Sequence, residues 1–117
     1  MEQFNLNTRS KDVFVVVDLY GELDAHTAPQ LEEEFQRLIT EDKYYIIVNC
    51  EKLTYISSAG LGVFMAYIEE VRQKDGDIKL TNMNSKVYNV FDLLGFPTLY
   101  DILKDENEAV SHFNNAK

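Results

Sequence analysis

Residues 45–71 read YIIVNCEKLTYISSAGLGVFMAYIEEV and join a strand pattern to a helix pattern. Residues 45–48 form a short apolar run of the kind found in strands that are buried on both faces. From Ser58 onward the apolar residues recur at helical spacing, at Leu61, Phe64, Met65, Ile68 and Val71. A buried strand that leads directly into such a helix is the repeating unit of α/β domains.

The chain before this unit shows two strand patterns and one helix pattern. Residues 4–6 alternate apolar and polar side chains and predict an edge strand, with a turn at residues 9–12. Residues 13–17 are an apolar, mostly β-branched run and predict a strand covered on both faces. Thr-Ala-Pro at residues 27–29 is a helix start signal, followed by an apolar stripe at Leu31, Phe35, Leu38 and Ile39.

The chain after this unit continues the alternation. Residues 78–80 predict a short strand, and residues 84–94 a helix capped by Asn84 or Ser85 and ended by glycine. Residues 99–100 suggest one more short strand, and the apolar positions of residues 109–113 a last helix. Cys50 is expected just beyond the end of its strand. The order predicts a single α/β domain over residues 1–117, with right-handed crossovers, a mixed sheet of four to five strands and four or so helices.

The composition limits the function. The chain has 117 residues, 11 Lys and Arg against 20 Asp and Glu, and a formal net charge of −9. This acidic excess argues against nucleic-acid binding and against an anionic membrane surface, since both require clustered basic residues. No apolar stretch approaches the length of a membrane span, and residues 1–4 do not resemble a signal peptide. We therefore expect a cytoplasmic protein that neither binds nucleic acid nor inserts into a membrane.

Residues suited to catalysis are sparse. The single cysteine, Cys50, excludes an internal disulfide and is expected to be a small buried hydrophobe. His26 and His112 have no cysteine at metal-ligand spacing, and Gly60 and Gly62 form only an isolated G-x-G rather than a phosphate-binding loop. We therefore expect no catalytic residue, no metal and no cofactor, and we do not expect the protein to be an enzyme.

Two segments lie where a predicted strand passes into a helix. In the first, residues 21–27, Gly21 allows a tight exit, and Asp24 or Thr27 can cap the helix. In the second, residues 55–64, Ser57 and Ser58 reach a helix start whose free N–H groups favour an anion. The residues alone leave two interpretations open, helix caps or a serine that receives a phosphate.

Together these segments resemble a family. Gly21-Glu22-Leu23-Asp24, followed by a helix near Thr27, and Ser58-Ala59-Gly60-Leu61-Gly62 at the start of the next helix resemble the STAS domain. The similarity runs from about Phe4 to Phe113 and includes the apolar stretch at residues 90–96. Within the family, the chain is similar to the stand-alone bacterial anti-sigma factor antagonists.

The resemblance implies a binding module of transcriptional regulation. Such antagonists capture an anti-sigma factor, often a serine kinase, and so free a sigma factor. The kinase phosphorylates one serine and breaks the complex, and a metal-dependent serine phosphatase reverses the reaction. Aligning residues 60–62 with the family's Gly-Leu-Gly gives Ser58 as the phosphorylated residue, with Asp24 in the facing loop. The implied partner surface comprises Asp24, Ser57, Ser58, Ala59, Gly60, Leu61 and Gly62.

The chain departs from the family pattern beside this serine. The family often has Asp before it and Ser or Thr after it, whereas this chain has Ser57 and Ala59. Ser57 is therefore the alternative phosphorylation site. An alternative function is a STAS subunit of a membrane lipid-transport ATPase complex, which needs no phosphoserine. A receiver domain would need an acidic pair after its first strand and an Asp after its third. Here Asp18 lies within the first strand, and the third candidate strand ends in Asn-Cys-Glu at residues 49–51. The spacing therefore excludes a receiver domain.

Overall fold

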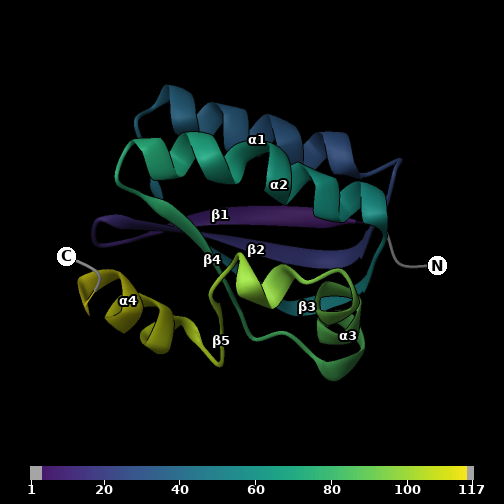
Figure 1. The fold of residues 1–117 in the computed structure, drawn as a ribbon. Helices are drawn as coiled ribbons and strands as arrows, with labels where there is room; N and C mark the ends of the chain where they lie inside the picture. Colours follow the sequence, from purple (N-terminus) through teal and green to yellow (C-terminus); the bar gives the residue numbers. More distant parts are fainter. Residues whose placement is uncertain (1–3, 116–117) are drawn as a thin grey trace.

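The computed structural model describes residues 4–115, in which strands and helices alternate (Figure 1). In chain order the elements are β1 Asn5–Lys11, β2 Phe14–Leu23, α1 Ala28–Thr40, β3 Tyr45–Ile56, α2 Ser58–Gln73, β4 Asp77–Thr81, α3 Ser85–Leu93, a short 3₁₀ helix η1 Phe96–Thr98, β5 Ile102–Leu103 and α4 Glu106–Asn115. The predicted alternation of strands and helices is confirmed.

The strands form one mixed sheet in the order β1-β2-β3-β4-β5. β1 is antiparallel to β2, and every other neighbouring pair is parallel. α1 and α2 lie side by side on one face of the sheet, and α4 lies on the other (Figure 1). The prediction of a mixed sheet of four to five strands with about four helices is therefore confirmed.

β2 is buried on both faces because its side chains alternate between two apolar clusters. Val15 and Val17 belong to the main core, with the buried faces of α1 and α2. Phe14 and Val16 belong to a smaller cluster beneath α4, together with Ile47, Ala109 and Phe113. The expectation of a strand covered on both faces is correct, and it makes β2 central to the fold.

Aromatic rings connect the helices within the main core. Phe64 of α2 lies 5.8 Å from Phe35 of α1 and 6.0 Å from Phe91 of α3, measured between ring centroids. Phe91 in turn lies 5.4 Å from Phe96. These contacts fix α2, and with it the start of α2, relative to both neighbouring helices.

Two apolar residues of the predicted helices are exposed. Met65 is 52% exposed because it lies on the outer side of α2, and the buried position beside Phe64 is taken by Val63. Leu94 is 55% exposed because α3 ends before it, at the left-handed Gly95. The glycine stop itself is confirmed.

Several predicted boundaries are wrong. β1 continues to Lys11, so the turn is at residues 12–13 rather than 9–12, and Val13 is exposed in it. Cys50 lies within β3, which extends to Ile56, rather than after the strand. Residues 99–100 follow η1 and form no strand; the fifth strand is Ile102–Leu103, which pairs with the end of β4.

Candidate functional site

The candidate site lies where β2 and β3 end side by side. The two strands are parallel and remain paired up to Leu23 and Ile56, across two irregularities in register, so the loops that follow them leave the same edge of the sheet. The backbone N–H of Ser57 donates to the carbonyl oxygen of Leu23 at 3.0 Å. This bond brings the loop that contains Asp24 beside the start of α2, as the sequence predicted.

Gly60 makes this close approach possible. A Cβ atom on Gly60 would lie 2.8 Å from Cγ of Leu23 and 3.0 Å from the Leu23 carbonyl oxygen. Both distances are shorter than normal van der Waals contact, so a larger residue would push α2 away from β2. Gly62 differs, because a Cβ there would meet nothing within 4 Å. The fold therefore requires a glycine at position 60 and has no steric need for one at position 62.

The two serines have different surroundings. Ser58 is the first residue of α2 and is exposed. Ser57 is the N-cap residue, with extended backbone, but its side chain makes no capping hydrogen bond. Its Oγ is buried and has no hydrogen-bond partner among the described residues. Ser57 thus occupies the N-cap position, but the interpretation of an ordinary serine cap is wrong, because its hydroxyl accepts no hydrogen bond from the free N–H groups of the helix.

The start of α2 is electrostatically open to an anion. The first turn carries no acidic residue, and no side chain caps it. The first N–H groups of a helix have no partner within the helix, and they carry the positive end of its dipole. The exposed surface beside them is formed by Ser58, Ala59 and Gly62, whereas Gly60 and Leu61 are buried.

Asp24 organises the facing loop and caps the turn that continues into α1. Its Oδ1 accepts hydrogen bonds from the backbone N–H groups of His26, at 2.9 Å, and Thr27, at 3.1 Å. Partial desolvation raises the pKa of Asp24, but hydrogen bonds from the Thr27 and His26 amides and the Thr27 hydroxyl outweigh it and hold the pKa below its usual value. The partly buried carboxylate beside the start of α2 is therefore ionised at neutral pH.

Thr27 occupies the predicted N-cap position of α1 without capping it. Its hydroxyl accepts from the backbone N–H of Asp24 at 2.8 Å and donates to the carbonyl oxygen of Glu22 at 2.9 Å. The expectation of a side-chain cap is wrong for Thr27, whereas the Asp24 carboxylate caps the turn that continues into α1, whose Ala28 N–H donates to the Asp24 carbonyl oxygen at 2.8 Å. Together the two side chains satisfy groups of the loop and give it a defined shape.

One contact near the site was not anticipated. Thr54 of β3 donates a hydrogen bond from its hydroxyl to the carbonyl oxygen of Gly21 at 3.1 Å. Gly21 has φ +86° at an irregularity in the β2–β3 pairing, which explains why a glycine is needed there. The sequence shows the glycine but not the strand pairing that brings Thr54 to it.

Cys50 and the histidines do not gather at this site. Cys50 is fully buried, and burial raises the pKa of its thiol to about 12, so the thiol stays protonated and unreactive at neutral pH. His26 lies exposed in the Asp24 loop, and His112 lies on α4. Within residues 4–115, no three side chains of His, Cys, Asp or Glu are grouped to hold a metal, and no helix has the length and apolarity to cross a membrane.

Comparisons with known proteins agree with this geometry. Residues 5–109 match the STAS domain family. The anti-sigma-B factor antagonists of Staphylococcus aureus (strain COL) and Staphylococcus epidermidis are each 30% identical over 98 residues, which cover 84% of this chain and 91% of the relative.

Solved structures give the same result. An anti-sigma factor antagonist from Mycobacterium paratuberculosis superposes with a TM-score of 0.87 at 18% identity, covering 96% of this chain and 95% of the other. Bacillus SpoIIAA in its phosphorylated form superposes with a TM-score of 0.70 at 27% identity, covering 94% and 98%. From the family match, the relatives and the shared fold, this chain belongs to the STAS domain family, among the anti-sigma factor antagonists.

Proposed function

We propose that this protein binds an anti-sigma factor that is also a serine kinase, and that phosphorylation of Ser58 by this kinase breaks the complex. A serine phosphatase restores the binding form, and the protein acts in the cytoplasm as a binding module without catalytic activity. The observation that carries the proposal is that Ser58 is exposed at the start of α2, where no side chain caps the helix, beside the Asp24 loop.

Exposure favours Ser58 over Ser57 as the phosphate acceptor. A kinase must bring the γ-phosphate of ATP in line with the serine oxygen, and Ser58 is exposed. The Ser57 oxygen is buried, and Ser57 also donates its backbone N–H to Leu23. Phosphorylation of Ser57 would therefore require the start of α2 to separate from β2.

The same position can hold a phosphate without disturbing the fold. A phosphate adds about −1.5 to −2 charges, and the free N–H groups and helix dipole offset its repulsion by about 0.3–2 kcal/mol. A partner surface shaped for a neutral hydroxyl has no such compensation, and mismatched charge at an interface costs several kcal/mol. Phosphorylation thus acts on the interface and leaves the core intact.

The partner surface consists of the exposed part of the predicted set. Ser58, Ala59 and Gly62 are exposed and Asp24 is partly buried, so these residues contact the anti-sigma factor. Gly60 and Leu61 are buried and hold the start of α2 in place. A glycine in the middle of a helix costs stability, so Gly62 is best explained by close approach of the partner backbone.

The site assignment predicts a difference between two serine variants. Ser58→Ala should abolish phosphate incorporation, whereas Ser57→Ala should leave it in place, because only the Ser58 oxygen is accessible. The kinase is first recovered from cytosol with the unphosphorylated protein, and peptide mapping by mass spectrometry after incubation with ATP then locates the phosphate. A phosphate on Ser57, or its persistence in Ser58→Ala, would contradict the assignment.

The charge of Asp24 can be tested separately from its hydrogen bonds. In Asp24→Asn the side-chain oxygen can still accept from the His26 and Thr27 amides, so the loop should keep its shape while it loses the charge. We expect weaker binding or slower phosphorylation, about tenfold, with an unchanged melting temperature. An equal binding constant and an equal phosphorylation rate would show that Asp24 only shapes the loop.

The two glycines provide a matched pair. Gly60→Ala should destabilise the fold by about 1–3 kcal/mol, because its methyl group meets Leu23. Gly62→Ala should instead raise stability by about 0.5–1 kcal/mol, yet weaken binding to the anti-sigma factor. Urea denaturation and calorimetric titration measure the two effects. Unchanged affinity of Gly62→Ala would remove the partner-based explanation for this glycine.

Phosphorylation should separate stability from affinity. The free energies of unfolding of the phosphorylated and unphosphorylated proteins, obtained from thermal melts, should agree to within about 1 kcal/mol. Titration with the anti-sigma factor should show an affinity lower by about a hundredfold, which corresponds to ~2.8 kcal/mol. A large fall in melting temperature with little change in affinity would mean that the phosphate acts by unfolding the domain.

A further inference from the structure

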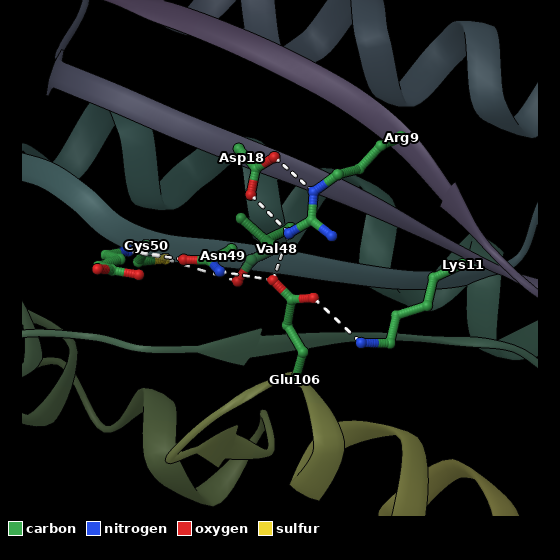
Figure 2. Close-up of polar contacts among 8 residues, drawn as sticks. Arg9, Lys11, Asp18, Val48, Asn49, Cys50 and Glu106 are labelled. Atoms are coloured by element: carbon green, nitrogen blue, oxygen red, sulfur yellow. Dashed lines mark hydrogen bonds and ion pairs between the residues drawn. The ribbon is translucent and has the colours of Figure 1, made fainter.

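A cluster of charged side chains joins α4 to the opposite end of the chain. Glu106, in the first turn of α4, accepts a hydrogen bond from Nδ2 of Asn49 in β3 at 2.6 Å. The same carboxylate is paired with Arg9 and, at 3.5 Å, with Nζ of Lys11, both in β1. Figure 2 shows the Glu106 side chain reaching from α4 to these strands.

The cluster is held in position from the sheet side. Arg9 also forms two hydrogen bonds with Asp18 of β2, from Nε at 2.8 Å and from Nη2 at 3.0 Å. This paired geometry fixes the plane of the guanidinium group and leaves it oriented toward Glu106. Only 15% of the Glu106 side chain is exposed, so its charge depends on these partners for compensation.

The start of α4 is formed by its own sequence, which leaves Glu106 free for this role. Asp105 accepts from the backbone N–H of Glu108 at 2.9 Å, and the Glu108 carboxylate accepts in return from the N–H of Lys104 at 3.3 Å. The first bond is a side-chain N-cap and the second ties the helix to the residue before the cap, so the start of α4 is defined locally. Glu106 therefore contributes to the attachment of α4 rather than to its formation.

The apolar attachment of α4 is small and separate from the main core. Ala109 and Phe113 pack on Phe14, Val16 and Ile47, and these five residues form a cluster of their own. The Phe113 ring lies 5.2 Å from the Phe14 ring. Tyr45, Leu103 and Val110 pack around this cluster, and Nζ of Lys79 lies 4.7 Å from the centre of the Phe113 ring. On the outer side of α4, Nδ1 of His112 lies 3.8 Å from the Asp101 carboxylate. All of these are side-chain contacts, so α4 can leave this surface without breaking a strand hydrogen bond.

We propose that α4 is a detachable cover for the second face of the sheet, which the Glu106 carboxylate holds closed and which opens while the rest of the fold remains intact. Opening uncovers Phe14, Val16 and Ile47 as an apolar surface on the face opposite α1 and α2. This conformational device is independent of the phosphorylation proposed for Ser58.

Hydrogen exchange on the full chain, followed by mass spectrometry, tests the cover. Glu106→Gln removes the charge and keeps the side-chain length. Amides of residues 106–115 should then exchange about tenfold faster, because charge-assisted hydrogen bonds are lost, while amides of β2–β4 keep their wild-type rates. Glu32→Gln removes a charge from an exposed position of α1 and should change neither set.

A milder variant keeps the test informative if Glu106→Gln does not fold. Lys11→Met retains the aliphatic part of the side chain and removes the longer of the two ion pairs of Glu106, so α4 should exchange faster by a smaller factor. Unchanged exchange in α4 for both variants would overturn the proposal. Equal acceleration in α4 and in β2–β4 would also overturn it, because α4 would then open only with the whole domain.

Discussion

The parallel pairing of β2 with β3 is the constraint on which the candidate site depends. It sends two consecutive strand ends to one edge of the sheet, and the hydrogen bond from Ser57 to the Leu23 carbonyl closes the gap between the loops. Gly60 permits that distance, since any side chain there would meet Leu23. As a consequence, the exposed serine at the start of α2 and the loop that holds the ionised Asp24 are neighbours.

The same pairing divides the interior into two unequal parts. Val15 and Val17 of β2 face the large core beneath α1 and α2, whereas Phe14 and Val16 face the small cluster beneath α4. The large core holds the site rigidly through the ring contacts of Phe64. Beside the small cluster, the Glu106 carboxylate of α4 is held by polar contacts from β1 and β3.

Charge is distributed in a way that suits a phosphate switch. The chain has a net charge of −9, yet the first turn of α2 contains no carboxylate and keeps its N–H groups open. The free N–H groups and the helix dipole therefore offset part of the repulsion that the acidic protein, Asp24 included, exerts on a new negative charge at this helix start. Arg9 and Lys11, by contrast, are already engaged with Glu106 and Asp18 on the other face.

Much of this protein follows from local sequence. The β-branched runs, the helical stripes and the glycine at position 95 gave the order of strands and helices, because periodicity and turn chemistry act over a few residues. The serine and glycine pattern at residues 58–62, with Asp24 before it, was enough to suggest the family. The helix stop at Gly95 and the cap at Asn84, which accepts from Val87 at 2.8 Å, were also local and were predicted correctly.

Only the tertiary structure decided the remaining features. Ser57 and Ser58 are identical and adjacent in sequence, but one hydroxyl is buried and the other residue exposed, because α2 packs against Leu23. Met65 fits the apolar stripe and is nevertheless exposed, since the orientation of α2 on the sheet selects Val63 instead. Glu106 meets Arg9 across 97 positions of sequence. Sequence periodicity therefore determined which elements form, whereas the packing of distant elements determined which of their side chains are accessible.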